Sequence, residues 1–323
     1  MCKIRRWATL LGMALWMHTA VAAADYPDKP ITMVVGFPAG QTTDIMSRLV
    51  AEALSRELGQ TIIVENRPGQ ATSMALRHLK DQPADGYTMM LTTPAGLVIN
   101  PHVYGDLRYD VFKDFDVAGL VAEMPLVLAA PATSPFATWQ DVLAHAKSHP
   151  GELNFSSSGN GSLPHLGMVL LQKQAGVTMT HVPYKGSPRA MQDLSAARVD
   201  VGFDTLVVIG GLAQAGKLKI LATTSNERLP SHPSVPTMIE SGAEKFTLTA
   251  WFMLVLPKGV DPAIIQRLNS AIKTMLDNPA FVERLSQTSA IPAYLNVNDS
   301  AAFLGAQYGL WKEVIATAGV KAD

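Results

Sequence analysis

The chain has 323 residues, with 26 lysines and arginines against 27 aspartates and glutamates and a formal net charge of −1. This balance excludes the basic footprint of a nucleic-acid-binding protein, and a hydrophobic content of 48% over this length is enough for two core-forming domains. Cys2 is the only cysteine, so the rest of the chain offers no disulfide and no cysteine-ligated metal site.

The first 24 residues have the pattern of a cleaved secretory signal. Basic residues in CKIRR precede the apolar stretch WATLLGMALWM, and Ala22 and Ala24 give the A-x-A spacing of a cleavage site. A membrane anchor is the alternative, but the apolar run is shorter than the roughly 20 residues that a bilayer requires. Arg5-Arg6 leaves a twin-arginine export route open. We expect a soluble exported protein that begins near Asp25.

After this segment, short apolar strands alternate with amphipathic helices. The predicted elements are a strand at 31–37, a helix from Asp44 to Gly59, a strand at 61–66, a helix after Pro68-Gly69 and a strand at 87–93. The buried faces of the two helices are expected to include Ile45 and Met74. Three strand–helix steps within about 70 residues indicate a doubly wound, mostly parallel sheet with helices on both faces.

The next region repeats this alternation with different loops. The predicted elements are a strand at 124–131, a helix opened by a Thr138–Asp141 capping box, a strand and helix within 153–172, a strand at 177–186, a helix from Ser187, a strand at 198–204, a helix to Ala215 and a strand at 217–225. A strand at 248–257, a helix from Asp261-Pro262 and a last helix ending near Gly319 follow. We predict two α/β lobes, the first discontinuous: 25–124 with 226–323, and 125–225.

Four predicted strands end in loops rich in hydroxyl and amide side chains, each directly ahead of a helix. Their sequences are GFPAGQTTD, RPGQATS, LTTPAG, which contains Thr93, and SSSGNGS. The N-terminus of a helix carries unsatisfied N–H groups and about +0.5 charge, so such loops suit an anion held reversibly by neutral donors. The alternative is that each hydroxyl only caps its own helix. Open α/β sheets bind ligands at the carboxyl ends of their strands, which favours the binding interpretation for the set.

An enzyme is the competing class. Ser156, Ser157 and Ser158 lie near His165, but they do not form the G-x-S-x-G elbow of a serine hydrolase, and SGNGS is not a phosphate-binding P-loop. His165 falls in the first turn of a predicted helix, where a packed or capping histidine is the favoured interpretation. We interpret the other histidines as scattered, with neither an H-x-x-x-H nor an H-E-x-x-H motif, so we predict neither a metal site nor a cofactor: His78, His102, His145, His149, His181 and His232.

A series of motifs resembles one known family along the whole mature chain. VVGFPAGQTTDIMSR, VENRPG, HVPYKGSPRAMQDL and PSVPTMIESG, in this order, resemble the solute-binding proteins of the tripartite tricarboxylate transporter class, the Bug or TctC family. The resemblance implies an α/β, two-lobed periplasmic binding protein of type II-like architecture, with mixed, mostly parallel sheets and a hinge cleft. It also implies a monomeric receptor, not an enzyme, that binds a small organic acid or polar molecule and delivers it to inner-membrane transporter subunits.

The resemblance also implies where the ligand is held. It points to Phe37, Ala39, Thr42 and Thr43 in the first loop, to Ser158, Gly159 and Ser162 in the second lobe, and to Asp204 after a later strand.

Gln41 and Gln70 stand where the family usually has glycine, and we include both among the ligand-binding residues. Their amides are expected to weaken the binding of small dicarboxylates relative to monocarboxylates or neutral polar compounds. A periplasmic sensory or partner-binding module and a hydrolase using the same cleft remain as alternatives.

Overall fold

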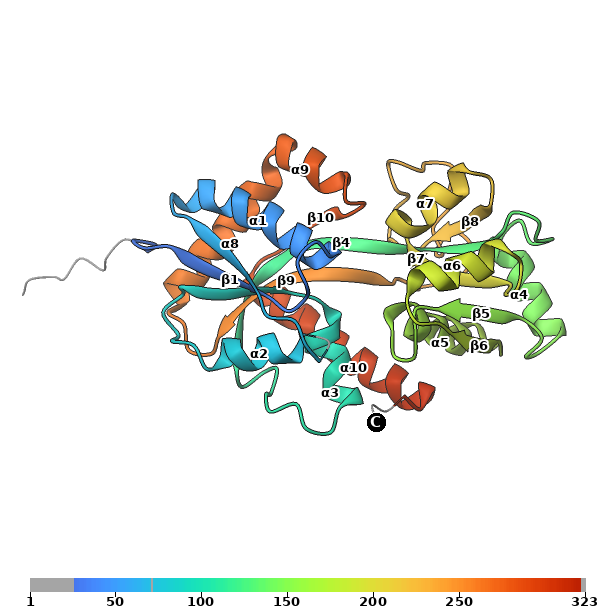
Figure 1. Ribbon diagram of the computed structural model, residues 1–323, viewed down its shortest axis with the longest axis horizontal. Helices are drawn as coiled ribbons and strands as arrows, with labels where there is room; N and C mark the ends of the chain where they lie inside the picture. The colour runs from blue at the N-terminus through green and yellow to red at the C-terminus, as the bar shows by residue number, and fades with distance from the viewer. Residues whose placement is uncertain (1–25, 71, 321–323) are drawn as a thin grey trace, which may run out of the picture.

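The computed structural model describes residues 26–70 and 72–320, so the predicted signal at 1–24 lies outside the described residues. Two bodies, called here the first and second lobes, are joined by the long strands β4 (Phe115–Pro131) and β9 (Thr249–Pro257) (Figure 1). Within the described ranges, none of the helices is both long enough and apolar enough to cross a bilayer.

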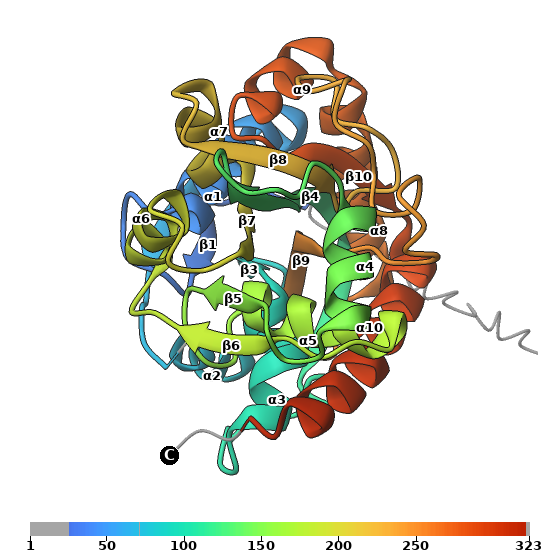
Figure 2. The same cartoon turned by 90° about the vertical axis from the view of Figure 1, so that its right-hand side faces the viewer.

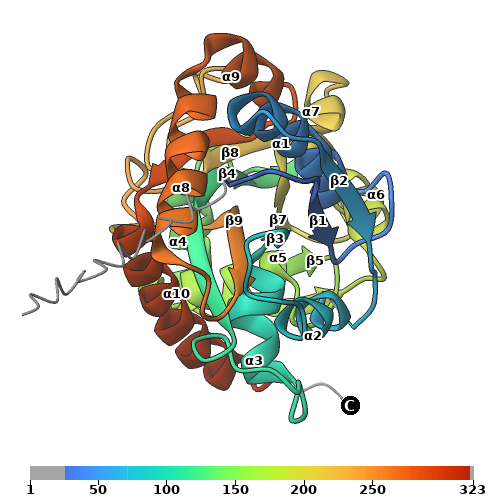
Figure 3. The same ribbon diagram turned by 90° about the vertical axis from the view of Figure 1, so that its left-hand side faces the viewer.

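The first lobe is built on three parallel strands with helices on both faces. Strand β1 (Ile31–Val35) lies between β2 (Ile62–Asn66) and β3 (Thr88–Thr92). Met33 packs with α1 (Thr42–Leu58) and α8 (Pro262–Asp277), and its neighbour Val34 packs on the other side with α2 (Ser73–Lys80). Figure 3 shows α1 and α8 on one side of these strands and α2 on the other. Successive side chains of one strand therefore pack into two different cores, one on each face of the sheet.

The second lobe repeats this plan. Strand β5 (Asn154–Ser157) pairs in parallel with β6 (Thr180–Pro183) and β7 (Val201–Thr205), and β8 (Leu218–Thr223) pairs with β4. Its helices, in two groups that pack into different cores, are α4 (Trp139–Ser148) with α5 (Leu163–Ala175), and α6 (Ser187–Ser195) with α7 (Leu206–Gln214).

The predicted parallel pairing is found among β1, β2 and β3 and among β5, β6 and β7. Strands β4 and β9 add antiparallel pairings to it. Among the described strands, every antiparallel pairing involves β4 or β9: β3 with β9, β4 with β9, β4 with β7, β4 with β8, and β10 (Ile291–Leu295) with β4. These two strands run in opposite directions between the lobes, so they join two parallel units into one mixed sheet.

Several local predictions were confirmed and a few were wrong. Thr138 and Asp141 form the predicted capping box, and Gly59 ends α1 in a left-handed conformation. Ile45 and Met74, expected inside, are exposed. The buried face of α1 is centred on Met46 and its neighbours at helical spacing. Ile45 lies at the edge of this face, on the same side of the helix as the exposed Arg48 three residues further along.

Four described elements have no counterpart in the sequence prediction. They are the π-helical turn η1 (Ala95–Ile99), α3 (Asn100–Val103), α9 (Pro279–Ser286) and β10. The last helix, α10 (Val297–Ala318), ends before Gly319 as predicted and runs beneath both lobes (Figure 1). Glu313 on α10 forms an ion pair of 2.7 Å with Lys173 on α5. This helix therefore contacts the second lobe as well as the first.

One buried hydroxyl ties together three segments where the lobes meet. The Thr224 Oγ1 atom accepts a hydrogen bond from Leu126 N at 2.8 Å, and it lies within donating distance of Leu248 O, 2.5 Å, and Leu126 O, 2.9 Å. Phe246 stacks on Phe203 of β7, with ring centroids 5.9 Å apart. We propose that the chain returns to the first lobe after Leu248 and not at 226, because the residues just before Leu248 pack on the second lobe.

Candidate functional site

A cavity of about 460 Å³ opens between the lobes, at the ends of their parallel strands. The first lobe contributes the start of α1, the turn after β3, and the η1–α3 segment, whereas the second lobe contributes the β5–α5 loop and the end of β7. Met124 on β4 and Phe252 on β9 form part of its apolar lining. Because its walls come from both lobes, rotation of one lobe toward the other would close it over a ligand.

Six of the predicted ligand-binding residues line this cavity together. They are Thr42, Thr43, Thr93, Ser158, Gly159 and Ser162. The sequence signal for these positions was the recurrence of hydroxyl-rich loops after strands, and the topology brings those loops to one place.

The other predicted residues lie outside the lining. Phe37, Ala39 and Gln41 belong to the loop before α1, where Gln41 is exposed. Gln70 is also exposed, and its Oε1 atom accepts a hydrogen bond from Arg77 Nη2 at 2.6 Å. The proposed effect of Gln41 and Gln70 on specificity stays a prediction.

Asp204 is buried directly behind Thr205, which does line the cavity. Its Oδ1 atom accepts a hydrogen bond from Thr205 N at 2.8 Å. Burial raises the pKa of this carboxyl, against the lowering effects of the Ser187 hydroxyl and the Thr205 amide. In this position Asp204 supports the start of α7.

The lining combines helix N-termini with neutral side chains. Helix α1 begins at Thr42, α5 at Leu163 after its cap Ser162, and α7 at Leu206 after Thr205. Neither α1 nor α7 has a side-chain capping bond. Among the described lining residues there is no lysine, arginine, aspartate or glutamate. The free N–H groups at the starts of these helices are therefore the donors that the site offers to an anion.

A buried carboxylate fixes the loop ahead of α1. Asp44 Oδ2 accepts hydrogen bonds from Gly40 N at 2.8 Å and Arg48 Nε at 3.0 Å, and Oδ1 accepts one from Asn66 Nδ2 at 2.8 Å. Asn66 Nδ2 also donates to Phe37 O at 3.0 Å. Burial acts to raise the pKa of Asp44, but these donors outweigh it and lower the pKa to about 2. Asp44 is thus ionised at neutral pH, and it affects the site indirectly, by fixing the loop ahead of α1.

Two stacked imidazoles support the loop of the second lobe. The rings of His165 and His181 lie 3.9 Å apart and are nearly parallel, and Phe155 stacks against His181 at 4.8 Å. Gly161 N donates to His165 Nδ1 at 3.1 Å, and Ser157 Oγ lies 2.7 Å from His181 Nε2. The prediction that His165 is a packed histidine in the first turn of a helix is confirmed.

Both of the stacked histidines have a lowered pKa. Burial lowers the pKa of His165. Burial, followed by the charge of His165, lowers the pKa of His181 to about 4. Both rings are therefore neutral at pH 7, which leaves His165 Nδ1 free to accept from Gly161 N. His181 opens the HVPYKG motif of the family resemblance, but the sequence did not indicate its stacking on His165, because that partner lies on another element.

Further lining residues were missed by the sequence analysis. They are Pro94, Ala95, Ile99, Asn100, Val103, Tyr104, Met124, Asn160, Gly161, Leu163, Thr205, Ala250 and Phe252. Most are apolar and lie on elements that no motif marked, such as η1 and α3. These residues line the cavity because the fold places their elements beside the hydroxyl-rich loops.

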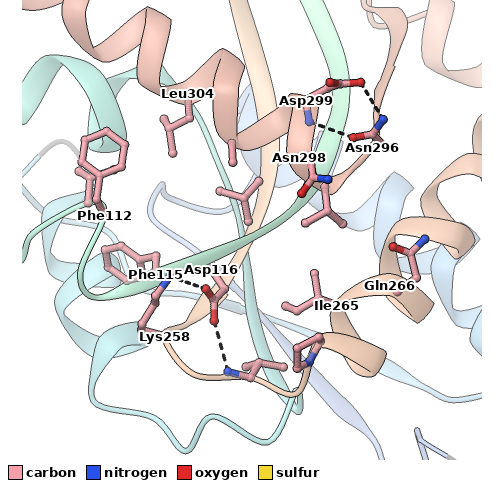
Figure 4. Close-up of a pocket in the computed structure, with 16 residues that line it drawn as sticks. Phe112, Phe115, Asp116, Lys258, Ile265, Gln266, Asn296, Asn298, Asp299 and Leu304 are labelled. Atoms are coloured by element: carbon pink, nitrogen blue, oxygen red, sulfur yellow. Dashed lines mark hydrogen bonds and ion pairs between the residues drawn. The ribbon is translucent and has the colours of Figure 1, made fainter.

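A larger cavity, about 620 Å³, lies in the first lobe (Figure 4). Its charged groups already have partners: Asp116 binds Lys258 Nζ and Gly259 N, both at 2.7 Å, and Asp299 binds Asn296 at 2.7 Å. Its described lining comes entirely from 111–117 and 258–304, so closure of the lobes would not enclose a ligand there. The cavity between the lobes is the better candidate site.

The fold and this cleft define a two-lobed solute-binding protein. The chain matches the model of the TctC tripartite tricarboxylate transporter family receptor over residues 46–320. It is 35% identical over 292 residues to a UPF0065 protein of Pseudomonas sp. (strain P51), covering 89% of this chain and 87% of that protein. It is 33% identical over 302 residues to protein BugT of Bordetella pertussis, covering 93% of each.

The chain is also similar to solved structures of proteins of this kind. R. palustris Rpa4515 with adipate has a TM-score of 0.75 and 32% identity, covering 92% of this chain and 99% of that one. Periplasmic binding protein BugD has a TM-score of 0.71 and 30% identity, covering 92% and 100%. MatC from Rhodopseudomonas palustris with bound malate has a TM-score of 0.68 and 28% identity, covering 90% and 100%.

The chain belongs to the TctC receptor family of tripartite tricarboxylate transporters, as the sequence resemblance indicated. It is a solute-binding receptor of the periplasmic type.

Proposed function

We propose that the protein binds a small carboxylate in the cavity between its lobes and delivers it to the membrane subunits of a tripartite transporter. One observation carries the proposal: three helix N-termini and several hydroxyls line the cavity, with no charged side chain among its described lining residues. Such donors bind an anion without a strong ion pair, which suits a receptor that must release its solute.

The apolar lining narrows the class of solute. Met124, Phe252, Val103 and Ile99 line the cavity beside the polar loops. These side chains suit the short carbon chain of an organic acid, and two of the similar structures hold adipate and malate. We propose an aliphatic carboxylate in which the carboxylate meets the helix N-termini and the carbon chain meets this apolar lining.

The remaining parts of the proposal concern the state of the protein. We propose that residues 1–24 are a signal peptide, that the exported protein is a monomer, and that it has no enzymatic activity. N-terminal sequencing of the exported protein tests the first, with Asp25 as the expected start, and light scattering tests the second. For the third, the purified protein should bind its solute and leave a panel of esters and amides unchanged.

The solute class is tested by thermal shift and calorimetry on the purified protein. A panel should contain aliphatic mono- and dicarboxylates, the matching amides, amino acids and sugars. A ligand that binds only the folded state stabilises it by about 2.7 kcal/mol at 100 times its Kd. We expect greater stabilisation by carboxylates, monocarboxylates above all, than by their amides. Equal stabilisation by an acid and its amide would contradict the anion-binding role of the helix N-termini.

A further inference from the structure

Two histidines and a glutamate converge at the end of α4, away from the cleft. His145 and His149 are four residues apart, an H-x-x-x-H spacing that our interpretation of the histidines as scattered overlooked. One ligand atom each from His145, His149 and Glu152 lies within 4.8 Å of the other two. Helix α4 lies at the end of the second lobe that faces the viewer in Figure 2, and none of the three residues lines the cavity between the lobes.

The backbone that carries this cluster is firmly held. Gly151 N donates to Thr178 O at 2.9 Å, and Gly151 O accepts from Thr180 Oγ1 at 2.9 Å. Gly151 has φ +81°, a left-handed conformation that favours glycine and turns the chain sharply after α4. The turn therefore directs Glu152 back toward the last turn of the helix.

Neighbouring side chains orient the two imidazoles. The His145 ring packs edge-on against Phe136 at 5.4 Å and stacks on His149 at 4.5 Å. Ser148 Oγ lies 2.9 Å from His149 Nδ1 and within donating distance of Ala144 O, 3.0 Å. A hydroxyl that gives its only proton to a carbonyl must accept from Nδ1–H, which leaves the lone pair of His149 Nε2 available. Such partners commonly fix the tautomer of metal-binding histidines.

The spacing of the ligand atoms matches a small divalent ion. His145 Nε2 lies 3.4 Å from Glu152 Oε1. Two ligands of a tetrahedral zinc ion, with bonds of about 2.0–2.1 Å, are about 3.3 Å apart. The ligand atom of His149 lies within 4.8 Å of the other two, and the exposed side chains of His149 and Glu152 are free to rotate to close this distance.

We propose that His145, His149 and Glu152 form a surface site for a borderline divalent transition-metal ion such as Zn²⁺, with water completing its coordination. Two imidazoles and one carboxylate are ligands that such ions prefer over Mg²⁺. The site is separate from the cleft, so its occupancy does not depend on the proposed solute.

The test is calorimetric titration of the purified, tag-free protein with Zn²⁺ at pH 7.5, in a buffer that does not bind metals. We expect one ion per chain. His145→Ala and His149→Ala should each weaken binding by at least about tenfold, the smallest loss usual even for supporting partners of metal ligands. Glu152→Gln should weaken binding with little change in shape. His232→Ala, on a loop outside the cluster, is the matched control and should bind as the wild type does.

Two further measurements complete the test. Binding should weaken at pH 5.5, because protons compete for the imidazoles, and Mg²⁺ at the same concentrations should give no saturable heat. Thermal unfolding shows whether the variants are folded. Absence of saturable Zn²⁺ binding, or unchanged binding in both histidine variants, would overturn the proposal, and equal binding of Mg²⁺ would overturn the assigned class of ion.

Discussion

Hydroxyl groups at the mouth of the cleft illustrate how single side chains serve two roles. Ser162 caps α5 by accepting from His165 N at 3.4 Å and also lines the cavity. Thr43 is buried, its carbonyl accepts from Ser47 Oγ at 2.7 Å, and the residue lines the same cavity. Ser162 thus caps a helix and lines the cavity at once, so capping does not exclude the binding role that we propose for this position, and the sequence could not separate the two interpretations.

Thr43→Ala and Ser158→Ala should each weaken solute binding while leaving the fold intact. Each variant removes one neutral hydroxyl from the cavity, and a lost hydrogen bond costs about 0.5–1.5 kcal/mol, or up to about 3 kcal/mol with a charged partner. Calorimetry with the best carboxylate measures the change in Kd. Ser270→Ala, exposed on α8, is the control. Unchanged Kd in both cavity variants would place the solute elsewhere.

The paired histidines predict a pH dependence of stability. The pKa of His181 is lowered from 6.5 to about 4, and that of His165 is lowered as well. The unfolded chain therefore binds protons first as the pH falls, and the free energy of unfolding should decrease from about pH 6.5 to about pH 4. Urea unfolding at pH 7.5 and pH 5 measures the decrease in the absence of solute.

A variant identifies the source of this pH dependence. His181→Phe keeps an aromatic ring in the stack with Phe155 but removes one of the two titrating groups, so its loss of stability between pH 7.5 and pH 5 should be smaller than in the wild type. His232→Gln is the control. An equal loss in His181→Phe and the wild type would show that the stack does not govern this range.

At the scale of elements, the crossing between the lobes depends on long-range pairing. Strand β4 pairs with β9 from Phe115 to Pro125 and with β7 and β8 from Leu126 onward. The change of partners between Pro125 and Leu126 occurs where Thr224 bonds to Leu126 and Leu248. The crossing between the lobes is therefore a short region in which the hydroxyl of Thr224 links its own segment to those of Leu126 and Leu248.

Thr224→Val should destabilise the protein. Valine fills the same space but removes the hydroxyl's hydrogen bonds to Leu126 and Leu248, whose backbone groups keep the bonds Leu126 N to Leu248 O and Thr224 N to Leu126 O, so the cost is about 0.5–1.5 kcal/mol. Urea unfolding measures the loss, and Thr61→Val, at the exposed residue just before β2, is the matched control. A free energy of unfolding equal to that of the wild type would show that the backbone bonds of the crossing suffice without the hydroxyl.

At the scale of the whole molecule, the cleft has walls from two lobes that are joined by narrow strand crossings. Solute binding should therefore make the protein more compact, because helix N-termini from both lobes can contact a solute together only when the lobes approach. Small-angle scattering with and without a saturating carboxylate measures the change in radius of gyration. The Thr43→Ala, Ser158→Ala double variant, at a solute concentration too low to saturate it, is the control. Binding without compaction would mean that one lobe holds the solute alone.

The sequence by itself determined the local structure of this protein and the kind of chemistry that its loops offer. Apolar periodicity located most strands and helices, and capping residues such as Thr138 and Asp261 marked helix starts because they act on neighbouring N–H groups. The hydroxyl-rich loops and the family resemblance indicated a site of neutral donors.

Only the tertiary structure decided which of these loops share a cavity. Thr43 and Ser158 line one cavity because β4 pairs with β9 in its first half and with β7 and β8 in its second half, and no local pattern encodes that change of partners. The stack of His165 on His181 depends on the parallel pairing of β5 with β6, and the hydroxyl of Thr224 between Leu126 and Leu248 depends on the pairing of β4 with its partners. Contacts between residues distant in sequence form only when the whole sheet is assembled, and for that reason they lay beyond the reach of sequence reasoning.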